Sequence, residues 1–492
     1  MKKVLLTMVA LVLLSSVTAA ADEAIQIDGD YQFRYDSLKG TVHEHYAFQD
    51  VLPWQLGGMT TPPPPTVKSY EVKNGSLMTN RFGLNIKANA MEDVTVKARL
   101  VMYKIWGHET STPGDGSFFG DRANGSNDGT IGHIPQDNTL RVDYAYSTWS
   151  NIGQIPLWLS VGRRPSTGGI PTNLKNNSEK TGTSGIPAIM VDYAFDGLTL
   201  GYAPDIPEMP GAYAKFCYGR GYDSGFVSNG SAPSYIMTNP TVTTSPGIAT
   251  SPTLNDTDFF GLNAALYDTE TLHVEVQYQK GMNIFDAPSD GSALTGPVRH
   301  NLGDIDWLGA VVMGKVSNLN LFLSAAQSKT HPDNQLFEIN TQSPAGFVPA
   351  AGMLYDAGSV KKSQSGTALY LGGRYDVKST GTKLGAEYNY GSKNWIGMVA
   401  AGDDPWTSKL GTRGSVYEVY IIQELRKKPI AKKGEAFFKL GYQSYKFDYT
   451  GSNNWVGAPK KISDLKSSPA NAQMLAPIDK ASDIYLTFEV RF

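Results

Sequence analysis

Few side chains in this sequence have the type and spacing that metal binding requires. Only two of the seven histidines lie close together, His43 and His45, with Glu44 between them. Alternate residues of an extended segment point to the same side, so both imidazoles could contact one metal ion. The spacing supplies no third ligand, and we expect no metal. Residues 115–128 are rich in Asp, Asn and Gly but lack EF-hand spacing, so a solvated loop is favoured over a calcium site.

Catalytic motifs are absent from the sequence. It contains no G-x-S-x-G, no H-E-x-x-H and no P-loop, and no Ser/His or Asp/His constellation is visible. The single cysteine, Cys217, excludes an internal disulfide and a C-x-x-C-H haem attachment site. The 43 basic residues against 46 acidic ones leave no basic footprint for nucleic acid. We therefore expect no enzyme, no cofactor and no nucleic-acid partner.

The first 21 residues have the pattern of a cleaved secretory signal peptide. Lys2 and Lys3 precede an apolar run over residues 4–14, and Ala19-Ala20-Ala21 offers an A-x-A cleavage site. No other run of about 18 apolar residues follows, so we expect no transmembrane helix in the mature chain. Residues 22–492 show no linker or change of composition, which predicts one domain.

Apolar and polar residues alternate at both ends of the mature chain, as they do in strands that have one polar and one apolar face. The apolar members of these two segments are Ile25, Ile27, Tyr31, Phe33 and Tyr35, and Ile484, Leu486, Phe488, Val490 and Phe492. Seven hairpins with short connections are predicted between them, over 80–90/94–106, 139–149/156–163, 188–195/198–203, 258–267/271–280, 306–315/319–328, 366–376/381–390 and 415–424/435–447. The third is placed by Asp196-Gly197, a typical two-residue turn.

These segments add up to sixteen strands, with 14 or 18 as alternatives. The short turns fall on one side and eight longer connections on the other, over 36–79, 107–138, 164–187, 204–257, 281–305, 329–365, 391–414 and 448–482. An even strand number with this asymmetry predicts an all-β transmembrane antiparallel barrel, with short periplasmic turns and long extracellular loops. Aromatic residues near strand ends, including Tyr144 and Tyr146, fit the interfacial belts of such barrels, although Tyr favours strands in general.

A sheet in lipid must leave no unpaired edge, so the last strand must pair with the first. The terminal strand with Phe488, Val490 and Phe492 resembles the signal that the outer-membrane assembly machinery reads. Deleting Phe492 is therefore predicted to impair assembly. The alternative is that any β-protein may end in a strand.

A barrel of sixteen strands should have a polar, water-filled interior. On each predicted strand, the apolar residues are taken to face lipid, so the residues that alternate with them are the pore-lining candidates. The positive ones are Arg34, Lys87, Lys97, Arg99, Arg141, Arg374, Lys383, Lys439 and Arg491, and the negative ones are Asp28, Asp30, Asp143, Asp192, Glu275, Glu387, Glu418 and Glu489. This balance predicts little ion selectivity. Lys87, Lys97 and Arg99 form either a local basic patch or ion pairs with Asp28 or Asp143.

The most distinctive stretch is VGRRPSTGGIPTNL, residues 161–174. Here the chain resembles a bacterial family of proposed outer-membrane porins, a domain of unknown function, and the resemblance extends over most of the mature chain without implying a substrate. In sixteen-stranded porins the third loop folds inward. By strand counting 164–187 is that loop, which gives the constriction candidates Arg163, Arg164, Lys175, Glu179 and Lys180. The loop lacks the acidic PEFGG-type motif, so an outer loop contacting lipopolysaccharide is the alternative.

The leading hypothesis is an outer-membrane porin of a Gram-negative bacterium that allows passive diffusion of small hydrophilic solutes or ions. The alternatives are a barrel that sheathes a partner, such as a periplasmic cytochrome in an electron conduit, and a receptor or adhesin that binds through the long loops. Expected partners are membrane lipid, lipopolysaccharide and the assembly machinery. A homotrimer is expected by analogy with other sixteen-stranded porins.

Overall fold

The computed structural model describes residues 24–55, 61, 64–107, 135, 138–178, 185–223, 226–228, 233–235, 255–285, 300–340, 347–399, 404–431 and 433–492. The predicted signal peptide, Glu179, Lys180 and all of residues 115–128 lie outside this part of the chain. Among the described residues, no helix combines the length and the apolar character that a membrane span needs.

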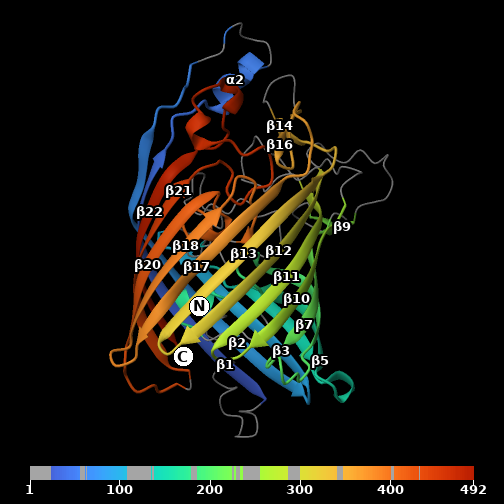
Figure 1. Cartoon of the computed structure of the whole chain (residues 1–492), viewed down its shortest axis with the longest axis vertical. Coiled ribbons are helices and arrows are strands. Elements are labelled where there is room, and N and C mark those ends of the chain that lie inside the picture. The colour runs from blue at the N-terminus through green and yellow to red at the C-terminus, as the bar shows by residue number, and fades with distance from the viewer. Residues whose placement is uncertain are drawn as a thin grey trace, which may run out of the picture.

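Sixteen antiparallel strands form one closed wall (Figure 1). Each strand pairs with the wall strands before and after it, and β22 returns to pair with β1, so the sheet has no free edge. The wall strands are β1 (Ile25–Val42), β2 (Tyr70–Met91), β3 (Val94–Ile105), β4 (Arg141–Trp149), β5 (Leu157–Ser166), β6 (Val191–Tyr202), β7 (Tyr213–Tyr222), β10 (Thr257–Asp268), β11 (Leu272–Phe285), β12 (Asn301–Val316), β13 (Leu319–Pro332), β17 (Ser365–Val377), β18 (Thr382–Gly391), β20 (Gly414–Glu424), β21 (Glu435–Phe447) and β22 (Ile478–Arg491). The predicted all-β barrel of about sixteen strands is confirmed.

The connections differ at the two ends of the barrel. At the turn end, the lower end in Figure 1, they cover 92–93, 150–156, 203–212, 269–271, 317–318, 378–381 and 425–434. At the loop end they cover 43–69, 106–140, 167–190, 223–256, 286–300, 333–364, 392–413 and 448–477. The small elements of the loop end are α2 (Phe48–Gln55), β8 (Phe226–Ser228), β9 (Pro233–Tyr235), β14 (Phe337–Asn340), β15 (Phe347–Gly352), β16 (Tyr355–Asp356), η5 (Ile462–Asp464) and η6 (Pro469–Asn471).

One predicted hairpin, 188–195/198–203, is wrong. Asp196 and Gly197 lie in the middle of β6, which is continuous, and Gly197 pairs with Gly162 of β5 and Gly219 of β7. Glycine is needed there because a side chain would collide with the carbonyl oxygen of Tyr218, not because the chain turns. The true partner, β7, was placed by the sequence in a long connection. One false strand and one missed strand cancel, which is why the total of sixteen is right.

The outer face of the wall is apolar. Along β22, Ile484 is 52% exposed whereas the neighbouring Asp483 and Tyr485 are fully buried. The same alternation runs along β1, where Ile27 and Tyr31 are exposed and Gln32 is buried. Large apolar side chains exposed all around a closed sheet are stable in contact with lipid and unfavourable in water. The wall therefore spans a membrane.

The barrel closes along a long register between β1 and β22. Phe33 pairs with Phe488 and Tyr31 with Val490, so the outward-facing positions of the two strands coincide. Beyond the last ladder pair, the amide of Gly29 donates to the carbonyl oxygen of Phe492 at 2.8 Å, and the amide of Phe492 donates back at 3.0 Å. Phe492 thus holds the turn end of the seam.

Candidate functional site

Two of the long connections fold into the barrel. The third loop, residues 167–190, leaves the wall between β5 and β6 and carries the short helix α3 (Thr172–Lys175). Its tip reaches the opposite wall, where Arg374 of β17 donates to the carbonyl oxygen of Leu174 at 2.6 Å and Arg491 of β22 donates to that of Asn176 at 2.5 Å. The inward fold, which the sequence left open, is therefore present.

The seventh loop, residues 392–413, crosses from the other side. It leaves the wall between β18 and β20 and forms β19 (Met398–Val399), which pairs in parallel with the start of β6. The amide of Met398 donates to the carbonyl oxygen of Met190 in the third loop at 3.1 Å. The two loops therefore meet inside the barrel.

An apolar core fills the half of the interior that faces β6 to β17. Its centre is Trp307 of β12 and Trp395 and Ile396 of the seventh loop, all fully buried together with Ile189 and Met190. The indole nitrogen of Trp307 donates to the carbonyl oxygen of Ile396 at 2.7 Å. Burying each large side chain contributes about 1.5–3 kcal/mol. The expectation of a uniformly polar lumen is wrong for this half, because the inward-folded loops cover the aromatic side chains that point inward from the wall.

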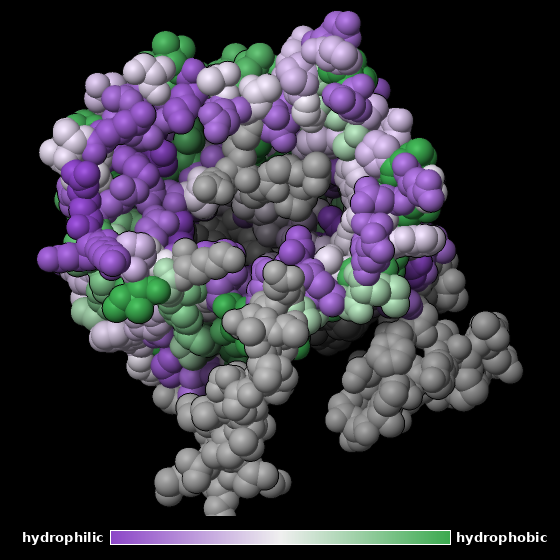
Figure 2. Space-filling model, turned by 90° about the horizontal axis from the view of Figure 1, so that it is seen from below, coloured by the Kyte–Doolittle hydropathy of each residue, from purple (hydrophilic) through white to green (hydrophobic). Residues whose placement is uncertain are grey.

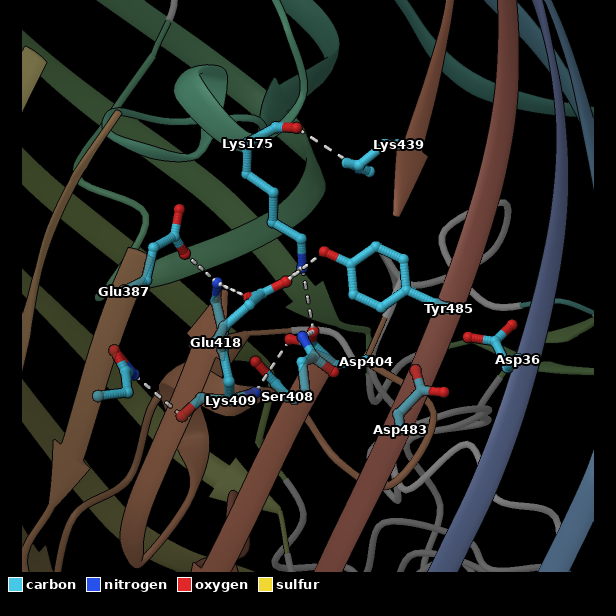
Figure 3. Close-up of polar contacts among 12 residues, drawn as sticks. Asp36, Lys175, Glu387, Asp404, Ser408, Lys409, Glu418, Lys439, Asp483 and Tyr485 are labelled. Carbon is cyan, nitrogen blue, oxygen red and sulfur yellow. Dashed lines mark hydrogen bonds and ion pairs between the residues drawn. The ribbon is translucent and has the colours of Figure 1, made fainter. Parts of the chain in front are cut away.

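A buried charge cluster anchors both loops to the wall (Figure 3). Glu418 of β20 lies between two lysines: its carboxylate is 2.8 Å from the Nζ of Lys175 in α3 and 2.6 Å from the Nζ of Lys409 in η4 (Lys409–Gly411). Lys409 also contacts Glu387 of β18, and the hydroxyl of Tyr485 donates to Glu418 at 2.7 Å. Burial alone would lower the pKa of the Lys409 amine, but Glu387 and Glu418 outweigh it and hold that pKa well above its usual value. The cluster is therefore charged and compensated.

Arg34 extends this cluster along β1. Its guanidinium is 2.6 Å from the carboxylate of Asp36 and 3.0 Å from that of Asp483, and it lies 4.4 Å from the centroid of the Tyr485 ring. Its side chain is only 1% exposed. The Arg34 charge is therefore compensated by two carboxylates.

The inward-facing side chains of β1 to β4 near the turn end are more open to water. We call this region the vestibule; it contains Asp28, Asp30, Asn85, Lys87, Lys97, Arg99 and Asp143. Arg99 is 2.6 Å from the carboxylate of Asp30 and 3.3 Å from that of Asp143, and its side chain is 15% exposed, compared with 1% for Glu418. Figure 2 shows that this end of the barrel is hollowed and rimmed by hydrophilic side chains.

A β-bulge in β4 moves two tyrosines into the lumen. The register with β3 shifts between Arg99 and Leu100, so Tyr144 pairs with Arg99 while Val142, 47% exposed, points outward. The hydroxyl of Tyr144 donates to Asn85 at 3.3 Å, and Tyr146 is only 8% exposed. Both were expected among the aromatic belts; simple alternation misplaces them because a bulge inserts one residue on one strand.

The structure divides the candidate residues into three groups. Lys87, Lys97, Arg99 and Asp143 lie in the vestibule, as just described. Arg34, Lys175, Glu387 and Arg374 lie in or beside the buried cluster, and Lys383 pairs with Glu424 at 2.5 Å. Arg164 of β5 lies beside the vestibule, because it stacks at 4.8 Å on the ring of Tyr146, which pairs with Lys97. The other two are dispersed: Arg163 lies on the outer face 3.6 Å from Asp196, and Arg141 begins β4 at the loop end.

Sequence reasoning missed Lys409 and Asp404, which belong to the seventh loop. Parity identifies inward residues only on strands, so it gives no information about loops. The sequence did contain one indication that this loop is buried, the run Trp395-Ile396-Gly397-Met398-Val399. So apolar a stretch is unusual in a connection that is exposed to water.

The histidines show no metal-binding arrangement among the described residues. His43 lies 3.5 Å from Asp479, and the Nδ1 of His45 contacts the carbonyl oxygen of His43 instead of a shared centre. His273, which the sequence did not single out, is fully buried between Asp268 at 3.0 Å and Glu275 at 2.8 Å near the turn end. This trio holds the β10–β11 hairpin together.

The packing of Tyr485 gives a testable prediction. A side chain at Gly441 of β21 would overlap the Tyr485 ring, so we expect Gly441→Val to displace this tyrosine from Glu418 and to destabilise the barrel by about 1–3 kcal/mol. Thermal unfolding in detergent, followed by circular dichroism, measures the effect. Gly75→Val is the matched control, since its added side chain meets nothing within 4 Å. An equal loss in both variants would contradict the packing argument.

Comparison with known proteins identifies the family. The model of the family described as "Protein of unknown function (DUF3373)" matches residues 71–492. The chain belongs to the DUF3373 family. A search of curated proteins finds no match to this DUF3373 protein.

Among solved structures, this DUF3373 barrel is similar to outer-membrane-expressed OmpT of Vibrio cholerae, with 11% identity and a TM-score of 0.41 over 95% of this chain and 98% of that one. It is also similar to OmpF of Salmonella typhi in complex with daunomycin, with 10% identity and a TM-score of 0.41 over 94% and 97%. A third is the anion-selective porin from Comamonas acidovorans, with 11% identity and a TM-score of 0.42 over 95% and 99%. The barrel itself is established by the pairing of its own strands.

Proposed function

We propose that this protein is a channel in the outer membrane of a Gram-negative bacterium, through which small hydrophilic solutes or ions pass by passive diffusion. The observation that carries the proposal is the combination of a closed, lipid-facing wall with a charged vestibule that opens at the turn end. The role of the protein is to provide a polar route through lipid, so no residue acts as a catalyst.

The two inward loops would set the narrowest part of the route. The third and seventh loops occupy the centre of the barrel and are fixed to the wall by ion pairs and by hydrogen bonds to their backbone. Solutes would pass along the remaining polar wall, β1 to β4, where Arg99 is more exposed than Glu418 of the buried cluster. In this arrangement Lys175 positions the constriction through Glu418, rather than contacting the solute itself.

The same loops argue against a barrel that sheathes a protein partner. A cytochrome inside the lumen would have to displace the apolar core around Trp307 and Trp395, both fully buried. A receptor or adhesin would need a binding surface on the long loops. One cavity of about 790 Å³ lies there, lined by residues such as Phe48, Phe337 and Leu475. Among the described residues that line it, the two charged ones, Asp356 and Lys460, form an ion pair with each other. We therefore place the function in the channel.

On this proposal, lipid covers the apolar outer face and lipopolysaccharide contacts the loop end. The outer-membrane assembly machinery inserts the chain, and a homotrimer is the assembly to test by native electrophoresis.

Conductance of the purified protein in planar lipid bilayers tests the proposal. We expect stable, stepwise openings that scale with salt concentration. A folded, inserted protein that never conducts would refute the channel.

Releasing the third loop should enlarge the openings. In the double variant Arg374→Ala/Arg491→Ala, the carbonyl oxygens at the loop tip lose charged donors, each worth about 1.5–3 kcal/mol. The loop is then less often in place, so we expect a higher and noisier single-channel conductance. The control Lys39→Ala/Arg426→Ala removes two cations from exposed positions and should leave the conductance unchanged. Equal conductance in both variants would mean that the third loop does not limit passage.

A further inference from the structure

The vestibule has three cations and three carboxylates, and two further cations, Arg164 and Lys433, lie beside it. Together these residues give five cations against three carboxylates, a positive excess that counting the lumen residues of the strands does not reveal. Over the whole lumen, positive and negative candidates nearly balance. In the structure, the two signs are not evenly distributed along the lumen. Most of the carboxylates that point into it belong to the buried cluster or already lie beside a cation. What matters to a passing ion is the charge left over where water reaches the wall.

The centre of this excess is a pair of lysines on neighbouring strands. Lys87 of β2 and Lys97 of β3 stand directly opposite each other in the ladder. Directly opposed residues have their Cβ atoms about 4.5–5.5 Å apart, and like charges placed so destabilise a sheet. Among the described residues, no carboxylate forms an ion pair with either lysine. Arg164 and Lys433 also lie close enough to act on the Lys97 ammonium, and both are positive.

The carboxylates of the vestibule are already committed. Asp30 and Asp143 both face Arg99, at 2.6 and 3.3 Å. Asp28 is 2.5 Å from the Nζ of Lys433 and also accepts a hydrogen bond from Asn85 at 2.7 Å. The sequence left two readings open for this group of strands. Arg99 is ion-paired, whereas Lys87 and Lys97 form the basic patch.

Arg164 adds a third cation beside the patch. Its guanidinium lies over the Tyr146 ring at 4.8 Å, and its Nε is buried without a hydrogen-bond partner among the described residues. A guanidinium held by an aromatic face keeps its edge free to donate to a planar or tetrahedral anion. All three groups carry positive charge and N–H donors, which is the chemistry that binds small oxyanions and halides.

We propose that Lys87 and Lys97 of the vestibule, together with Arg164 beside them, select small anions such as chloride, phosphate and simple carboxylates over cations. This inference rests on the proposed channel function and names its solute class. Neither lysine has a carboxylate partner in the part of the chain that the structure describes. Such unpaired ammonium groups raise the local concentration of anions and repel cations from the same space.

Reversal potentials under a potassium chloride gradient test the proposal. We expect the wild-type channel to pass chloride in preference to potassium. In Lys87→Gln/Lys97→Gln the permeability ratio of chloride to potassium should fall by about threefold or more, because the local potential changes by at least about one kT. The control Lys39→Gln/Lys446→Gln removes two lysines that are 61% and 69% exposed, outside the vestibule, and should keep the wild-type ratio.

The possible outcomes distinguish the anion selectivity from the channel function on which it rests. A channel that conducts but prefers potassium, or one whose ratio is unchanged in the vestibule variant, overturns the anion inference and leaves the channel intact. A protein that never conducts overturns the channel itself. If the double variant does not fold, the single variant Lys97→Gln replaces it. Its permeability ratio of chloride to potassium is then compared with that of the wild type. Millimolar phosphate should also reduce chloride current in the wild type more than in either vestibule variant, and equal reduction would count against binding at the patch.

Discussion

Replacing Glu418 with alanine is expected to destabilise the barrel by about 3–5 kcal/mol, because it leaves buried positive charge without its partner. Glu418 is 2% exposed and contacts both Lys175 and Lys409. Neither lysine can reach water without moving the loop that carries it. We therefore expect a lower temperature of unfolding, measured by circular dichroism in detergent. We also expect the third loop to be cut at lower protease concentration.

Two controls separate charge from packing in this experiment. Glu71→Ala removes a carboxylate whose partner Lys39 is equally exposed, so it should change stability by no more than about 1 kcal/mol. The double variant Glu418→Gln/Lys409→Met removes one charge of each sign and should recover much of the loss. If Glu418→Ala unfolds at the wild-type temperature, the cluster does not hold the loops.

Removing Phe492 is expected to reduce the amount of folded protein in the outer membrane several-fold, with little effect on the conductance of the molecules that do assemble. The deletion eliminates both backbone hydrogen bonds with Gly29, at 2.8 and 3.0 Å, and an outward aromatic at the β1–β22 seam. An unpaired strand end in lipid is costly because no water can replace the lost partner. Heat-modifiable electrophoretic mobility of membrane fractions measures the folded amount.

The conservative variant Phe492→Leu distinguishes the two contributions. It keeps the backbone pair with Gly29 and an apolar side chain facing lipid, but it removes the aromatic ring. Normal levels in this variant and low levels in the deletion would assign the effect to closure of the seam. Low levels in both would assign it to recognition of the aromatic by the assembly machinery. Normal levels of the deletion itself would contradict either role.

The wall was predictable from the sequence because strand alternation is local. The pattern over Ile25–Tyr35 and Ile484–Phe492 predicted which residues face outward, and the register of β1 with β22 agrees with it. The errors in the predicted strands arose where one local sequence pattern is compatible with two structures. Asp196-Gly197 is typical of a tight turn but also suits a strand whose neighbour approaches closely, and only the paired strands distinguish the two.

The interior was much less predictable. Parity placed Glu387 and Glu418 in the lumen, but their partner Lys409 comes from a loop, and the other partner, Lys175, is more than two hundred residues away in the chain. Which charges cancel depends on which residues pair in three dimensions, so the nearly equal count of positive and negative candidates was uninformative. The same holds for the apolar core, which requires two loops from opposite walls to meet.

That meeting of loops also has a mechanical consequence. A tube made of a single sheet resists unzipping but can be squeezed into an oval, because its strands bend and slide more readily than they separate. Here Met398 and Val399, carried from the β18–β20 side, are hydrogen-bonded to the start of β6 on the far side of the tube. The seventh loop thus connects two opposite sides of the barrel across its diameter. Changes in lateral membrane pressure should deform this barrel less than one with an unbraced bore.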